Sequence, residues 1–162
     1  NTVGIAARTI TLAEHYGIKP INIRIDSFGT GSDVSQEIAL GIKERVLPVN
    51  VGGKPEDERF LNVRAEMYWR MREWIRKGGH LVYHSCWKQM LIIYYKRTLS
   101  GKIQIMSKEE MMRRGWDSPD ELDATALTFV GAGAGRDGLV GGGGSVSRRL
   151  SNEELVKITD LY

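Results

Sequence analysis

Two aspartates, Asp120 and Asp123, are three residues apart at the expected start of a helix. Ser118 is a suitable N-cap, Pro119 suits the first helical position, and Glu121 completes a capping box with Ser118. Because residues three apart are neighbours on a helix surface, the two carboxylates can share one site, and their oxygens suit hard cations. Acids in a first turn also complement the helix dipole, so a purely structural role stays open.

A third carboxylate, Asp26, ends an expected strand. Ile21, Ile23 and Ile25 alternate with polar residues, which is typical of a half-buried strand. Asp26 follows directly and is therefore expected at the strand end.

The elements around this strand predict an α/β sheet. Apolar residues at steps of three and four predict a helix over residues 3–16 and another over residues 34–42, capped by Ser32 or Asp33. Residues 46–51 suggest a second short strand. Alternating helices and strands are typical of α/β folds.

The second half of the chain alternates between helical and hairpin patterns. An amphipathic helix is expected from Phe60 to Trp74 and stops at Gly78. The stretch over 80–92 is ambiguous, with a short strand at 81–82 and a short helix at 87–90. A hairpin of 93–98 and 102–106 follows, and then a helix from Ser107 to Gly115 with Glu110 in its capping box. The acidic helix that begins at Ser118 follows.

The chain changes character after residue 130. Runs of glycine between residues 131 and 149 are typical of a flexible linker, and residues 151–158 could form one short helix. We therefore expect a folded domain over 1–130 and a glycine-rich tail over 131–162. Gly133 to Gly138 match the spacing of a dinucleotide-binding loop, but the preceding element is a helix rather than the strand that such a loop requires.

Composition narrows the classes of function. The 162 residues suffice for one domain with a core, and 23 basic against 20 acidic residues give a net charge of only +3. Cys86 is the single cysteine, which rules out an internal disulfide and a cysteine-based zinc site and makes a reducing compartment such as cytoplasm the expected location. The longest apolar stretch, residues 90–95, is too short to span a bilayer, so no membrane partner is expected.

Basic and aromatic residues gather on one expected helix, which leaves two interpretations open. Arginines and a lysine crowd residues 59–77, and they either contact DNA or form a solvated face. Trp69, Trp74 and Trp87 could stack on bases, but tryptophans at helical spacing more often fill a core.

Several motifs occur in a family-like order. These are Asp26 followed by Gly29 and Gly31, then VNVGGK at 49–54, NVRAEMYW at 62–69, SKEEMMRRG at 107–115, and SPDELDATALTF at 118–129. Together they resemble the C-terminal nuclease domain of the large terminase subunit of tailed bacteriophages, over about residues 1–130. The resemblance implies a ribonuclease H-like fold, with a mixed sheet flanked by helices and a small β-hairpin insertion.

The resemblance also implies a function and its residues. Relatives cut concatemeric double-stranded DNA during packaging in the host cytoplasm, with two Mg²⁺ or Mn²⁺ ions. Asp26 would be the metal ligand on the strand and Asp123 the one on the helix, with Asp120 also at the metal site. The segments that match would place three cations, Lys54, Arg64 and Lys108, toward DNA or in support of the site.

One departure from the family bears on activity. Family members carry a further essential aspartate on a strand before the first helix, and this chain begins at that helix. We therefore expect an N-terminally truncated sheet and weak or no cleavage by the chain alone. An upstream ATPase motor domain, a portal and a small terminase subunit are the partners that the resemblance implies. The alternative is a noncatalytic DNA-binding or portal-docking module whose acids only cap helices.

Overall fold

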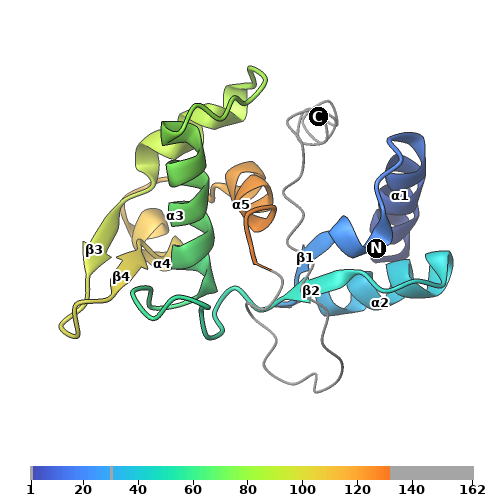
Figure 1. The fold of residues 1–162 in the computed structure, drawn as a ribbon, viewed down its shortest axis with the longest axis horizontal. Coiled ribbons are helices and arrows are strands. Elements are labelled where there is room, and N and C mark those ends of the chain that lie inside the picture. The colour runs from blue at the N-terminus through green and yellow to red at the C-terminus, as the bar shows by residue number, and fades with distance from the viewer. Residues whose placement is uncertain (1, 30, 132–162) are drawn as a thin grey trace.

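A computed structural model describes residues 2–29 and 31–131 and shows a mixed α/β fold (Figure 1). The predicted glycine-rich tail beyond Gly131, its short helix and the dinucleotide-like spacing at 133–138 lie outside the described residues. Within the described residues, no helix has both the length and the apolar character needed to cross a bilayer.

The first half of the chain forms two helices beside a two-stranded parallel sheet. Its elements are α1 (Thr2–His15), a 3₁₀ turn η1 (Pro20–Asn22), β1 (Arg24–Asp26), α2 (Gly31–Ile42) and β2 (Leu47–Val49). β1 and β2 pair in parallel, with Arg24 opposite Leu47 and Asp26 opposite Val49. Both predicted strands therefore form, although each is shorter than its apolar pattern.

In the second half, a hairpin and two short helices pack around a long helix. Its elements are α3 (Val63–Arg76), a 3₁₀ helix η2 (Ser85–Ile92), the antiparallel strands β3 (Tyr95–Arg97) and β4 (Ile103–Ile105), α4 (Lys108–Arg113) and α5 (Asp120–Leu127). The predicted hairpin is confirmed, and Gly101 in its turn has a φ of +80°. Residues 81–82 form no strand, and the predicted short helix is part of η2.

The two faces of the parallel sheet contact two different cores. Ile25 packs with α1 and α2 around the buried Ile38. Leu47 and Val49 pack with the second core, which includes Leu122 of α5. Because side chains alternate along a strand, Asp26, opposite Val49, belongs to the same face as that residue. Figure 1 shows α5 between α3 and the parallel sheet, and α5 contacts β1.

The backbone at Gly31, shortly after Asp26, leaves no room for a side chain. A Cβ on Gly31 would collide with the carbonyl oxygen of Asp26, so the first residue of α2 lies directly against the end of β1. α2 begins at Gly31, which places Ser32 and Asp33 in its first turn; their prediction as N-caps is wrong by one residue or more.

The C-terminal end of the described residues also packs closely, against α3 and the loop before it. The carboxylate of Glu66 is 2% exposed and accepts hydrogen bonds from the Glu56 amide at 2.8 Å and from Arg70 at 2.6 Å. Arg70 also binds the Glu56 carboxylate at 2.6 Å. A Cβ on Gly131 would collide with both Glu56 and Arg70, so the segment after α5 is packed against this ion-pair network.

We expect Gly31→Ala to lower the free energy of unfolding by about 1–3 kcal/mol, the usual range for overpacking against a rigid neighbour. Gly52→Ala is the matched control, because its Cβ would lie 3.5 Å from the Asn50 side chain, an ordinary contact. Urea denaturation of both variants measures the difference. Equal stability of the two would contradict the close approach at Asp26.

Candidate carboxylate site

Asp123 is the more enclosed of the two candidate aspartates on α5. Its side chain is 16% exposed, and its carboxylate contacts three donors from two other helices. Oδ1 accepts hydrogen bonds from the Tyr68 hydroxyl at 2.5 Å and from Arg64 Nη2 at 3.2 Å. Oδ2 lies 3.0 Å from the ammonium of Lys108. Both oxygens of Asp123 are therefore engaged by protein donors.

α3 supplies two of these donors from one face. Arg64 and Tyr68 are four residues apart, so they lie one above the other on the helix. Asn62 caps α3 by accepting the Ala65 amide at 3.0 Å. Arg64 also donates to the carbonyl of Met106 at 2.8 Å, and its guanidinium lies 5.2 Å from the Tyr68 ring centre. The guanidinium is thus fixed between the end of the hairpin and Asp123.

Lys108 joins the two aspartates of α5. It is the first residue of α4, where Ser107 caps the helix by accepting the Glu110 amide at 3.2 Å, as predicted. Its Nζ lies 3.0 Å from Asp120 Oδ1, in addition to its contact with Asp123. Asp120 and Asp123 therefore share one cation. That they form a metal site stays a prediction.

The start of α5 differs from the predicted capping box. The helix begins at Asp120, with Pro119 at the N-cap position and no side-chain cap within the segment. Ser118 instead donates its hydroxyl hydrogen to Asp120 Oδ1 at 2.6 Å. Gln89 of η2 takes the capping role, because its Oε1 accepts the Leu122 amide at 3.1 Å and its Nε2 donates to Glu121.

Asp26 lies on the neighbouring strand but outside this hydrogen-bonded group. Its Oδ1 accepts the Phe28 amide at 3.1 Å, which closes a tight turn after β1. Within the described residues, no hydrogen bond or ion pair joins Asp26 to Asp120 or Asp123. The sheet geometry nevertheless brings Asp26 to the α5 side, because β1 contacts α5 and Asp26 shares the face of Val49.

Comparison with known proteins adds no relative to this picture. No protein-family model matches the chain, and no curated protein matches it. The function is therefore inferred from the residues and their geometry.

The donor set can be compared with the needs of a divalent metal. In residues 2–29 and 31–131, no three His, Cys, Asp or Glu side chains are grouped closely enough to hold an ion together. Mg²⁺ commonly binds through one or two carboxylates, with water and substrate phosphates completing the octahedron. The pair Asp120 and Asp123 supplies two such carboxylates, and both lie 3.0 Å from the Lys108 ammonium.

Hydrogen bonds, burial and neighbouring charges shift three pKa values within the group. Hydrogen bonds from Ser118 and then Lys108 lower the pKa of Asp120. Partial burial opposes the charged form of Lys108, but its hydrogen bonds to Asp123 and Asp120 outweigh burial and raise its pKa. Burial and then the charge of Asp123 raise the pKa of Tyr68, so this phenol is a hydrogen-bond donor across the physiological range.

The predicted DNA-facing cations have different surroundings. Arg64 and Lys108 contact Asp123, whereas Lys54 is exposed in the loop between β2 and α3. The arginines of the basic stretch pair with acids, namely Arg59 with Asp57, Arg64 with Asp123, Arg70 with Glu56 and Glu66, and Arg72 and Arg76 with Glu73. Much of the positive charge on α3 is therefore neutralised within the molecule.

Sequence reasoning missed Tyr68, Ser118 and Gln89 as parts of the site. Tyr68 follows Arg64 by four residues, so a helical wheel could have placed both on the α5 side of α3. Ser118 was predicted at the right place with the wrong partner. Gln89 carries no sequence signal, because its contact with α5 depends on the path of η2.

Tyr68→Phe should lower the free energy of unfolding at neutral pH by about 1.5–3 kcal/mol, because it deletes a hydrogen bond to a carboxylate that is largely buried. Tyr83→Phe is the matched control, since Tyr83 is 87% exposed. Chemical denaturation of the two variants compares them. If both lose the same small amount, the bond to Asp123 contributes nothing to stability.

Ser118→Ala should raise the pKa of Asp120 toward its ordinary value, because the Ser118 hydrogen bond is the largest cause of its depression. The depressed pKa stabilises the fold above the unfolded carboxyl pKa, and this contribution is lost as pH falls through the folded value. Carboxyl-carbon NMR titration measures the shift. Ser100→Ala, in the hairpin turn, serves as the control and should leave Asp120 unchanged; an unchanged pKa in Ser118→Ala would refute the assignment.

Proposed function

We propose that this chain is the nuclease part of a viral DNA-packaging terminase large subunit, a ribonuclease H-like endonuclease that hydrolyses phosphodiester bonds of double-stranded DNA with Mg²⁺ or Mn²⁺. The observation that carries the proposal is the shared cation of Asp120 and Asp123. Two carboxylates from adjacent positions on α5 lie 3.0 Å from a single ammonium, on the side of the sheet that holds Asp26.

The order and contacts of the elements support the proposed fold. A helix precedes the parallel pair β1–β2, and the strand-borne Asp26 and the helix-borne Asp123 lie on elements in contact. The antiparallel hairpin lies between α3 and the acidic helix, where the resemblance places an insertion. Within the described residues β1 pairs only with β2, so its other edge is open to a further strand.

Each residue of the group has a role in the proposal. Asp123 and Asp120 contribute oxygens to the metal, and Asp26 contributes from the facing strand. The ions would supply neutralisation of phosphate charge and activation of water. Arg64 and Tyr68 orient the Asp123 carboxylate through their hydrogen bonds. Lys108 pairs with both α5 carboxylates, and it would support the site or face DNA.

The proposed partners follow from the same assignment. DNA is the substrate, an ATPase motor domain precedes the nuclease in the full protein, and the portal and small terminase subunit meet the complex in the host cytoplasm during virion assembly. A further aspartate, on a strand that pairs with the open edge of β1, would complete the metal site. The chain of 162 residues alone would then cut DNA weakly or not at all.

A noncatalytic DNA-binding or portal-docking role is the alternative, and one observation favours it. Every hydrogen bond or ion pair of the Asp123 carboxylate in the described structure comes from Arg64, Tyr68 or Lys108, a pattern that a purely structural carboxylate also shows. Such a module would bind DNA in a salt-sensitive way that Mn²⁺ does not change.

Supercoiled plasmid cleavage with Mn²⁺ tests the proposal. We expect weak or no cutting by the chain of 162 residues, and cutting by the protein extended with its natural upstream segment. In the extended protein, Asp123→Ala should reduce the rate by at least about a thousandfold, because it removes a metal ligand. Asp117→Ala removes the same charge from an exposed position just before α5 and should keep most of the activity.

The outcomes separate the two functions. Loss of cutting in Asp123→Ala, with the fold intact by circular dichroism and activity kept in Asp117→Ala, supports the nuclease. A folded extended protein that binds DNA equally with and without Mn²⁺ and never cuts it would leave the binding module in its place.

A further inference from the structure

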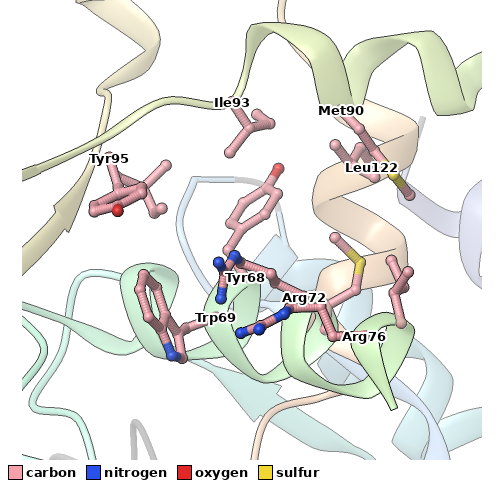
Figure 2. A pocket seen from close by; sticks show the side chains of 11 residues that line it. Tyr68, Trp69, Arg72, Arg76, Met90, Ile93, Tyr95 and Leu122 are labelled. Carbon is pink, nitrogen blue, oxygen red and sulfur yellow. The ribbon is translucent and has the colours of Figure 1, made fainter. Parts of the chain in front are cut away.

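A cavity of about 240 Å³ lies between α3, η2 and the hairpin, and Leu122 of α5 also lines it. Figure 2 shows the Tyr68 ring at its centre, with Trp69 and Tyr95 on one side and Met90 and Leu122 on the other. The Tyr68 hydroxyl binds Asp123, whereas its ring forms part of the cavity wall. The cavity is therefore a neighbour of the carboxylate site and uses different surfaces.

The walls of this cavity are apolar and its charged groups are positive. Trp69 and Tyr95 meet edge to face with their ring centres 5.3 Å apart, and the side chains of Met90 and Ile93 complete the apolar lining. Arg72 and Arg76 come from successive turns of α3, and the lining contains no acidic residue. Apolar walls with a few polar groups that fix orientation are typical of small-molecule sites.

The two arginines retain a net positive charge. Both pair with the single carboxylate of Glu73, Arg72 at 2.6 Å and Arg76 at 3.3 Å. Two cations with one anion leave one unit of positive charge. The Arg72 guanidinium is also held 4.8 Å from the Trp69 ring centre, whereas Arg76 is 63% exposed and is the more accessible of the two.

The volume limits what can bind. A cavity of about 150 Å³ is enough to hold benzene, so about 240 Å³ suits a bicyclic aromatic group. Aromatic rings and thioethers make favourable contacts with such a group. We propose that this cavity is a binding site for a small molecule that carries a bicyclic aromatic group, or an apolar group of similar size, and one anionic group. The site neither requires nor implies nuclease activity.

In the bound arrangement, the apolar part lies against the rings of Tyr68 and Trp69, and the anion meets Arg76, the more exposed of the two arginines. A neutral ligand of the same shape would fill the cavity but lose the contact with Arg76. The contribution of an exposed charge pair is small, so the charge should alter affinity by only a few fold.

Naphthalene-2-sulfonate is a suitable probe, and its neutral partner is naphthalene-2-sulfonamide. The full chain with ¹³C-labelled methionine methyl groups reports the location by NMR, because Met71 and Met90 line the cavity. Met112 is the internal control, since it is 61% exposed on α4 and does not line the cavity. We expect saturable shifts of Met71 and Met90, with Met112 unchanged.

Two variants test the charge and the volume separately. Arg76→Gln should weaken sulfonate binding about twofold to fivefold and leave sulfonamide binding unchanged. Arg113→Gln, which removes an exposed charge from α4, should change neither. Ile93→Trp should fill the cavity and reduce binding of both probes at least tenfold, with the other methionine signals confirming an intact fold.

Three results would overturn the assignment. Shifts that include Met112 or fail to saturate would show surface adsorption instead of a site. Undiminished binding to a folded Ile93→Trp would place the ligand elsewhere. Equal affinity for the neutral and anionic probes would remove the anion from the proposal.

Discussion

The enclosed carboxylate of Asp123 links three helices in the second half of the molecule. A carboxylate that is 16% exposed loses much of its hydration and needs donors in compensation. Those donors come from α3 and α4, so one side chain connects three helices that are distant in sequence. Arg64 extends the connection to the end of the hairpin through the Met106 carbonyl. The positions of α3, α4, α5 and the hairpin are therefore all linked to the Asp123 carboxylate.

Around the Asp123 carboxylate, apolar packing contributes most of the stability. The fully buried Met67 and Leu122 come from α3 and α5, and Val49 brings the parallel sheet into the same core. The helices α1 and α2 form a second core with the opposite face of β1. The short sheet thus separates two apolar clusters, and Asp26 is on the side of the one that contains α5.

Local patterns in the sequence predicted most of the elements and placed Asp120 and Asp123 at the start of one helix. Capping and apolar periodicity located α1, α3 and α4, and the glycine turn located the hairpin. What failed were features that depend on distant contacts. Gln89 caps α5 because η2 folds beside it, and no local rule could replace Ser118 with a residue 29 positions upstream. The basic stretch allowed either a DNA surface or a solvated face, and contact with DNA stays a prediction. Arg64 and Arg70 pair with Asp123 and Glu56, whose proximity depends on the tertiary fold. Arg72, by contrast, pairs with its sequence neighbour Glu73. Asp26 was placed at its strand end correctly, while its ligand role is a proposal.

Within the described residues β1 pairs only with β2, and its unpaired edge affects how the protein behaves at high concentration. Unpaired strand edges invite pairing between molecules, and natural proteins limit this by keeping such edges short and charged. β1 has only three residues, and Arg24 and Asp26 flank its single apolar position. An edge of this kind offers few backbone hydrogen bonds to another molecule and places charges where an intruding strand would pack. Self-association through β1 is thereby disfavoured.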